Sequence, residues 1–208
     1  MTPTAPDALY ERALAGGALN VRAEDGPALP LDVARWLGPV TAADRAVLDR
    51  ACGPVLDVGC GPGRHVRALV ARGVFALGVD ASPPAVRVAR SRGAHVVECS
   101  VFDDLLPAGA WGAALLLDGS VGIGGCPMRL LRRVRELLAP TGRALVEVGP
   151  PGAPTRIARL RLEDDRDRSV AFPWALVGLD GLTELARAVG LRRVDAWCHS
   201  GRWFAELA

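Results

Sequence analysis

The chain of 208 residues contains no lysine, so all 25 of its Lys-plus-Arg positions are arginine. A phosphate-binding loop of the Walker type requires Gly-Lys-Ser/Thr, and the lack of lysine excludes that class of nucleotide site. The frequent use of arginine, alanine, glycine and proline indicates a GC-rich bacterial coding background rather than selection for a charged partner.

Cysteines are few and follow no pattern. The five are odd in number and never spaced as CxxC: Cys52, Cys60, Cys99, Cys126 and Cys198. This usage predicts reduced thiols in a cytoplasm and argues against a structural zinc, so we expect no metal. No apolar run approaches the roughly twenty residues that span a bilayer, and no signal peptide begins the sequence. We therefore expect no membrane partner.

A large charge of one sign is also lacking, because the formal net charge is only +2. A nucleic-acid-binding surface is more often a basic face of one sign. One predicted helix does carry a basic cluster, which we interpret as its solvated face: Arg129, Arg132, Arg133 and Arg135. No nucleic-acid partner is expected.

The most informative stretch that is present runs from Val55 to Arg64. It is typical of a short buried strand that ends in an acidic residue, turns through three alternate glycines and enters a helix. Such a turn directs free backbone N–H groups at a bound anion, and glycine permits positive φ angles there. A nicotinamide loop of the form Gly-x-Gly-x-x-Gly would need glycine where Arg64 stands. A plain glycine-rich turn between strand and helix is the remaining alternative.

The pattern Asp-x-Gly-x-Gly-x-Gly resembles the cofactor loop of class I S-adenosylmethionine (SAM)-dependent methyltransferases. The resemblance implies an α/β fold: a Rossmann-like three-layer sandwich with a mostly parallel seven-stranded sheet, in which strand seven is antiparallel and lies between strands five and six. We expect a helical leader or lid over residues 1–40, with helices at 9–15 and 31–37. A single SAM-binding domain then covers residues 41–208.

The expected strands follow from apolar runs separated by helical stripes and Gly or Pro stops. They lie at 55–58, 74–80, 96–99, 113–117, 144–148, 192–198 and 203–207. Ligands of such a sheet bind beyond the carboxyl ends of its parallel strands.

The resemblance also implies which residues hold SAM. Asp80 lies about twenty residues beyond the loop, as expected for a carboxylate that accepts both ribose hydroxyls; a helix-entry cap is its alternative. Val101 would meet the adenine edge, and Phe102 or a neighbouring apolar side chain would cover its face, while either Ser100 or Asp103 contacts the ring. Packing in the core is the alternative for Phe102. The full expected set is Asp57, Gly59, Cys60, Gly61, Gly63, Arg64, Asp80, Ala81, Ser100, Val101, Phe102, Asp118 and Gly119.

Two residues are candidates for the chemistry. Asp118 ends the fourth strand, and three roles are open to it: binding the methionine ammonium, orienting the acceptor, or acting as a base. A cap of a helix or turn is its alternative. His199 follows strand six and is the histidine best placed to act as a base. His65 enters the helix after the loop, where it either lies near the carboxylate of the cofactor or is an inert surface residue. The predicted acceptor site is lined by Tyr10, Ser120, Phe172 and Trp174.

The sequence thus predicts a cytoplasmic bacterial SAM-dependent methyltransferase that acts on a small organic acceptor, as a monomer or homodimer. The sequence Asn/Asp-Pro-Pro-Tyr/Phe, which marks methyltransferases of nucleic-acid amines, is absent. Two alternatives remain: a SAM-binding protein with a non-methylating or regulatory role, and a nicotinamide- or nucleotide-binding module. The acceptor and the methylated atom are not predicted.

Overall fold

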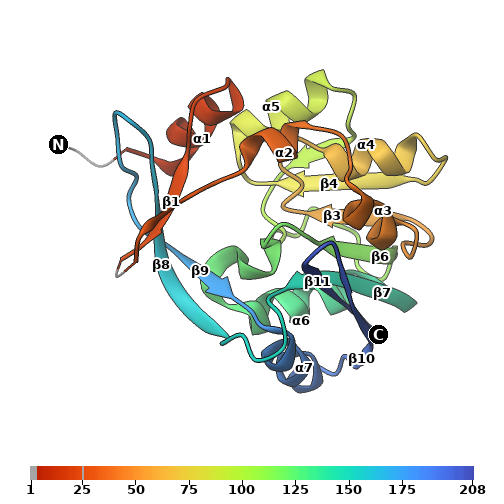
Figure 1. Ribbon diagram of the computed structural model, residues 1–208. Helices are drawn as coiled ribbons and strands as arrows, with labels where there is room; N and C mark the ends of the chain where they lie inside the picture. Colours follow the sequence, from red (N-terminus) through yellow and green to blue (C-terminus); the bar gives the residue numbers. More distant parts are fainter. Residues whose placement is uncertain (1–3, 25) are drawn as a thin grey trace.

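The computed structural model describes residues 4–24 and 26–208, which form two β-sheets with helices packed around them (Figure 1). The main sheet has seven strands in the order β10-β11-β7-β6-β3-β4-β5. Their bounds are β3 (Val55–Val58), β4 (Ala76–Asp80), β5 (Val96–Glu98), β6 (Trp111–Leu116), β7 (Leu138–Val148), β10 (Arg193–His199) and β11 (Arg202–Leu207).

The strand directions of the main sheet match the expectation. Strands β3 to β7 pair in parallel with one another, and β11 pairs antiparallel with both of its neighbours. Because β11 lies between β7 and β10, the last strand of the chain is inserted between the fifth and sixth strands of the sheet. The predicted Rossmann-like topology is confirmed.

Helices cover both faces of this sheet, as Figure 1 shows. Side chains alternate across the strands: Ala114 and Leu116 of β6 face one core, whereas Ala113 and Leu115 face the other. One core includes α6 (Pro127–Leu137) and α7 (Leu179–Ala188); the opposite core includes α3 (Ala42–Leu48), α4 (Arg64–Val70) and α5 (Pro83–Ser91). Successive side chains of a strand point to opposite faces of the sheet. A strand that is buried on both faces therefore carries apolar residues at consecutive positions.

A second sheet was not expected. Its order is β2-β1-β8-β9, and it lies apart from the main sheet (Figure 1). Its bounds are β1 (Asn20–Ala23), β2 (Ala28–Pro30), β8 (Arg156–Glu163) and β9 (Phe172–Leu176). The leader does form helices α1 (Pro6–Leu14) and α2 (Val33–Leu37), but the segment between them is a hairpin that pairs with β8. The two predicted helices are thus present with shifted bounds, and the hairpin between them was not predicted, because strand pairing with a segment far along the chain decides its conformation.

The leader is fixed to the rest of the molecule by a third apolar core. Leu9, Leu19 and Val33 are buried together, and Tyr10 and Trp36 pack against them. Helix α1 contacts both α5 and β8. The leader therefore bridges the two sheets. In the described residues, none of the helices combines the length and apolar character that crossing a membrane requires.

Candidate functional site

The glycine-rich loop joins β3 to α4 with three positive φ angles, at Gly59 (+68°), Gly61 (+52°) and Gly63 (+77°). A Cβ atom added to Gly59 would lie 2.8 Å from Cδ1 of Ile123, and one added to Gly63 would lie 2.6 Å from Cβ of Ala94. Both positions therefore need glycine for space as well as for backbone conformation.

The N–H groups of this loop are engaged within the protein. Gly59 and Cys60 both donate to the carbonyl of Val79, at 2.8 and 3.1 Å, and Gly63 donates to Cys60 at 3.0 Å. Gly61 donates to Oδ2 of Asp80 at 2.8 Å. Within residues 59–63 the N–H groups are therefore not free for an anion, and three of their four bonds attach the loop to the end of β4. The prediction of free N–H groups then applies only to the first turn of α4.

Asp80 lies opposite the loop at the end of β4. Its Oδ1 accepts a hydrogen bond from the N–H of Ser82 at 2.8 Å, while its Oδ2 accepts the one from Gly61. Burial raises the pKa of this carboxyl group, and the two backbone bonds oppose that effect. A carboxylate has about four lone-pair directions, so the Asp80 carboxylate retains acceptor capacity toward a ligand.

The turn after β5 holds Ser100 and Val101 against the same space. Asp103 accepts a hydrogen bond from the N–H of Ser100 at 2.9 Å, so its carboxylate is turned back onto its own turn. Phe102 is also turned away from the cavity: the guanidinium carbon of Arg129 lies 4.1 Å from its ring centroid. The prediction that Phe102 covers a ligand is not supported, since the turn directs its ring toward α6.

Asp118, which follows β6, is surrounded by three arginines. Its Oδ1 accepts from Arg35 at 2.7 Å and from Arg202 at 3.1 Å, and its Oδ2 accepts from Arg64 at 2.5 Å. The residue has a φ of +54°, and its N–H donates to Glu147 at 2.7 Å. Both oxygens of this carboxylate are therefore engaged by guanidinium groups of the protein itself.

These contacts belong to a balanced network at the ends of the central strands. Arg64 and Arg202 both pair with the fully buried Asp44 of α3, and Arg202 also pairs with Glu147 at 2.6 Å. Four carboxylates face four cationic groups: Asp44, Asp57, Asp118 and Glu147 with Arg35, Arg64, Arg202 and His65. Four members of this network were not predicted from the sequence: Asp44, Arg35, Arg202 and Glu147. The Thr41–Asp44 capping box is a local pattern, but it indicates the start of a helix and not an ion pair.

His65 is buried rather than on the surface, which corrects the sequence interpretation. Its Nε2 lies 3.5 Å from Asp44, and its Nδ1 lies 3.5 Å from Asp57. Burial lowers its pKa, but the two carboxylates outweigh burial and raise the pKa to about 9. The imidazole is therefore cationic at neutral pH and is held between two anions.

His199 lies away from this region. It is half-buried at the end of β10, and its Nδ1 is 3.0 Å from the hydroxyl of its neighbour Ser200. Strand β10 is the outermost strand of the main sheet, whereas the site lies beyond β3, β4 and β6. The structure does not bring His199 to the other predicted site residues, so its assignment as a base is not supported.

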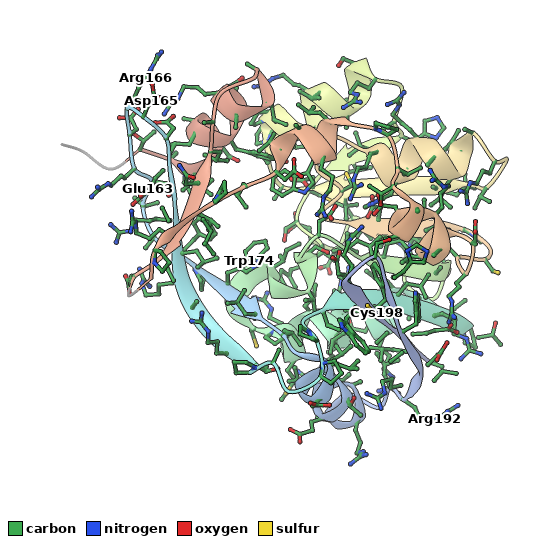
Figure 2. All side chains as sticks on the ribbon, viewed as in Figure 1. Glu163, Asp165, Arg166, Trp174, Arg192 and Cys198 are labelled. Atoms are coloured by element: carbon green, nitrogen blue, oxygen red, sulfur yellow. The ribbon has the colours of Figure 1, made fainter. Side chains whose placement is uncertain are left out.

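A cavity of about 570 Å³ lies between the glycine-rich loop, the leader and the second sheet. This volume is within the range of small-molecule sites. Trp174 of β9 projects between the second sheet and the rest of the molecule (Figure 2). The predicted residues that line the cavity are Tyr10, Asp57, Gly59, Cys60, Gly61, Arg64, Asp80, Ala81, Ser100, Val101, Asp118, Ser120, Phe172 and Trp174. Those that do not are Gly63, Phe102, Gly119 and His199.

The wall residues have defined neighbours. Tyr10 and Trp36 form an edge-to-face pair with ring centroids 6.1 Å apart, and Phe172 and Trp174 form another at 6.1 Å. Burial, followed by nearby carboxylates, raises the pKa of the Tyr10 hydroxyl, so the phenol stays neutral. Burial also raises the pKa of the Cys60 thiol, in line with its interpretation as a packing residue. In residues 4–24 and 26–208 no cluster of three His, Cys, Asp or Glu side chains is arranged to hold a metal.

Residues 55–142 match a protein-family model described as "Methyltransferase domain". That span contains the glycine-rich loop, Asp80, the turn after β5 and Asp118. No curated protein matches the chain.

Several solved structures share the fold. A SAM-dependent methyltransferase from Bacteroides fragilis, in complex with S-adenosyl-L-homocysteine, has 21% identity and a TM-score of 0.82, and the match covers 97% of this chain and 93% of that one. The 1,6-didemethyltoxoflavin-N1-methyltransferase of Burkholderia thailandensis has 21% identity and a TM-score of 0.64, covering 100% and 91%. The CcbJ methyltransferase of Streptomyces caelestis has 18% identity and a TM-score of 0.62, covering 83% and 91%.

Proposed function

We propose, from the premise that residues 55–142 form a methyltransferase domain, that this chain transfers the methyl group of SAM to a small organic acceptor bound in the same cavity. SAM supplies a methyl group already activated by its sulfonium, so transfer is an in-line displacement. The protein's contribution is then mainly to hold nucleophile and methyl group in line, and such alignment alone can correspond to effective molarities of roughly 10⁵ M or more.

One observation carries the choice of SAM: the loop of residues 59–63 has no N–H group left for a phosphate, since four donate within the protein and Pro62 has none. The pyrophosphate of a dinucleotide would have only the N–H groups at the start of α4, where the buried Arg64 stands in place of the third glycine of a nicotinamide loop. SAM has no phosphate. Asp80 keeps acceptor capacity for ribose hydroxyls, which supports a nucleoside with a free ribose at this position.

The remaining assignments follow the lining of the cavity. We assign the adenine to the turn at Ser100 and Val101, beside the ribose at Asp80 and Ala81. We assign the amino-acid end to the charged groups near Asp57, Arg64 and Asp118. Asp118 then orients the ligand through its charge, and no proton-transfer step is assigned to it.

The acceptor is assigned to the space beside the second sheet, near Tyr10, Ser120, Phe172 and Trp174. The small-molecule acceptor named for the Burkholderia enzyme, 1,6-didemethyltoxoflavin, supports an acceptor of this size.

The proposal includes a bacterial cytoplasmic setting and no nucleic-acid partner. All five cysteines are free thiols, which favours a reducing compartment.

The basic cluster on α6 does not favour a nucleic-acid partner, because three of its four arginines are engaged within the protein. Arg129 stacks on Phe102, Arg133 donates to the carbonyls of Val101 and Asp103, and Arg135 donates to the carbonyl of Val189. A monomer or a homodimer is compatible with this site, which one chain completes by itself.

Parallel titrations with S-adenosyl-L-homocysteine (SAH) and NADH test the proposal by isothermal calorimetry. We expect micromolar binding of SAH and no measurable binding of NADH. Micromolar binding of NADH alone would end the methyltransferase proposal and favour a nicotinamide module. Binding of SAH without methyl transfer to any acceptor would favour a regulatory SAM-binding protein.

A further inference from the structure

One wall of the cavity is the inner face of the second sheet. Val21 of β1 lies opposite Leu162 of β8, and Leu160 of β8 lies opposite Phe172 of β9, so these side chains share one face. Because neighbouring strands lie about 4.8 Å apart, three strands present a surface roughly 10 Å wide. Every residue that this sheet contributes to the cavity is apolar or aromatic: Val21, Leu160, Leu162, Phe172, Trp174 and Leu176.

Strand alternation keeps charge out of this wall. Arg159 and Arg161 lie on the other face of β8, where Arg159 pairs with Glu24 at 3.2 Å. Arg156 shares the face of Leu160, but it is exposed at the start of the strand and does not line the cavity. A carboxylate held against the wall would lose its hydration without gaining a counter-ion.

The cationic residues that line the cavity are also engaged. Arg64 and His65 are both buried, and each faces two carboxylates of the charged network. An anionic acceptor would therefore compete with carboxylates of the protein itself. Both walls disfavour an acceptor with a negative charge.

The carboxylates that line the cavity lie at its cofactor end. Asp57 and Asp118 are at the position proposed for the amino-acid part of SAM, and Asp80 is at the position proposed for the ribose. Asp7 accepts a hydrogen bond at 2.7 Å from the hydroxyl of Ser82, two residues beyond Asp80. Their remaining capacity to accept hydrogen bonds thus lies on the side of the cofactor, opposite the apolar wall.

Ser120 lies at the junction of the two sides. It begins the short helical segment η1 (Ser120–Gly125), which packs against β9. A Cβ added to Gly59 would lie 3.2 Å from Cβ of Ser120, and one added to Gly122 would lie 2.4 Å from Nε1 of Trp174. The same segment therefore meets the cofactor loop at one residue and the aromatic wall two residues later.

The Ser120 hydroxyl is available to a ligand. The residue is 5% exposed and lines the cavity, and its buried Oγ has no hydrogen-bond partner among the described residues. A buried hydroxyl without a partner is unfavourable, so a ligand that supplies one gains affinity. Because a hydroxyl both donates and accepts, it recognises a polar group without requiring that the group be charged.

We propose, on the basis of the proposed function, that the acceptor is a small amphipathic molecule without negative charge. Its apolar body packs on the wall that includes Leu160, Phe172 and Trp174, and its polar head forms a hydrogen bond with Oγ of Ser120. The wall then selects the acceptor by its apolar area, and Ser120 turns the polar head toward the cofactor side.

The first test uses the full chain saturated with SAH and three probes: naphthalene-2-methanol, benzyl alcohol with the same head on a smaller body, and 2-naphthoate with the same body and an anionic head. Ligand-observed NMR gives the dissociation constants. We expect naphthalene-2-methanol to bind at least fivefold more tightly than either of the others. A smaller difference from either one, or no binding of any probe to SAH-loaded protein, overturns the inference. Failure of SAH itself to bind counts instead against the proposed function.

Ser120→Ala tests the contact with the polar head. The comparison probe is 2-methylnaphthalene, which has the same body without a hydroxyl. We expect the variant to bind naphthalene-2-methanol at least threefold more weakly, with the affinities for 2-methylnaphthalene and SAH unchanged. Equal losses for both probes would mean that the change disturbs the wall in general, and a loss confined to SAH would place Ser120 on the cofactor. Either result overturns the role of Ser120.

Two positions on β8 test the wall. Leu160→Ser removes apolar surface from the cavity, whereas Ile157→Ser changes a residue that is 66% exposed and does not line it. We expect Leu160→Ser to weaken naphthalene-2-methanol binding at least fivefold with SAH affinity unchanged, and Ile157→Ser to change neither. If Leu160→Ser does not fold, Leu176→Ser takes its place, because Leu176 lines the cavity and is already 40% exposed. Unchanged probe binding in the folded wall variant overturns the assignment of the acceptor to this wall.

Discussion

The Nη2 atom of Arg35 lies 2.7 Å from Oδ1 of Asp118, which joins the leader helix α2 to the end of the central strand β6. The two residues are 83 positions apart in the chain. The same carboxylate is held by Arg64 at the start of α4 and by Arg202 of β11. A leader that covers the cavity is thus attached at the polar end of the site, where the amino-acid part of SAM is proposed to bind.

Arg35→Ala should loosen the leader. The Arg35 side chain is 32% exposed, so the ion pair is partly screened and we expect a loss of about 1 kcal/mol in the free energy of unfolding. SAH should dissociate several-fold faster, measured by stopped-flow tryptophan fluorescence. The control is Arg87→Ala, since Arg87 pairs with Glu11 of α1 but both side chains are 58% exposed. Equal SAH dissociation rates in the two variants would show that the Arg35–Asp118 contact does not hold the leader over the ligand.

Asp80→Ala should weaken SAH binding at least tenfold. Each charge-assisted hydrogen bond to a ribose hydroxyl contributes on the order of 1.5–3 kcal/mol, and tenfold corresponds to about 1.4 kcal/mol. Calorimetry measures the effect. Asp49→Ala serves as the control, because Asp49 is 67% exposed and pairs with Arg72. An unchanged dissociation constant in Asp80→Ala would contradict the ribose assignment.

The stability of the chain should fall as pH rises from about 6.5 to about 9. The two carboxylates facing His65 raise its pKa from 6.5 to about 9 in the folded chain, although burial alone would lower it. A raised pKa in the folded state means that folding takes up a proton, so this contribution is complete below pH 6.5 and is lost as pH passes 9. The shift corresponds to about 3 kcal/mol.

Urea unfolding at several pH values measures this dependence, with His65→Asn as the comparison. The groups that face His65 are Asp44 of α3 and Asp57 of β3, with Arg64 beside it on α4. We expect the slope of unfolding free energy against pH in this range to be smaller in the variant. Equal slopes in the two proteins would mean that His65 is neutral in the folded chain.

The main sheet and the glycine-rich loop were predictable because their signals are local. Short apolar runs separated by helical stripes fix the alternation of strands and helices, and the handedness of crossovers then restricts the strand order. The positive φ angles at Gly59, Gly61 and Gly63 are a local demand that only glycine meets without strain. The position of Asp80 was predictable for the same reason, because Asp80 ends β4, the strand that pairs with β3 beside the loop.

The arginine network and the second sheet depend on contacts between distant segments. Arg202 meets Asp44 across 158 positions, and no periodicity within either segment indicates the pair. Val21 of β1 pairs with Leu162 of β8, yet four residues of β1 are too few to show an alternation of their own. Arg and Leu alternate along β8, which is typical of a strand with one apolar face. The high charge of this segment hid that pattern. The resemblance already placed strand six at the edge of the sheet, beyond strand seven, so the end of that strand, and His199 with it, lies apart from the ends of β3, β4 and β6.

Gly59→Ala should abolish tight SAH binding, and Gly73→Ala should not. Both residues have positive φ angles, +68° and +76°, so an added methyl group costs each backbone a similar amount, about 1–2 kcal/mol. A Cβ on Gly73 meets nothing within 4 Å, whereas one on Gly59 lies 2.8 Å from Cδ1 of Ile123, a residue of the cavity wall. Ile123 must then move within the proposed cofactor site. We expect a larger loss of thermal stability in Gly59→Ala than in Gly73→Ala, because only the first change adds a clash to the backbone strain, and an SAH affinity at least tenfold lower in Gly59→Ala alone. Equal affinities would mean that the close approach of the loop to Ile123 does not shape the ligand site, because backbone strain is matched between the two changes.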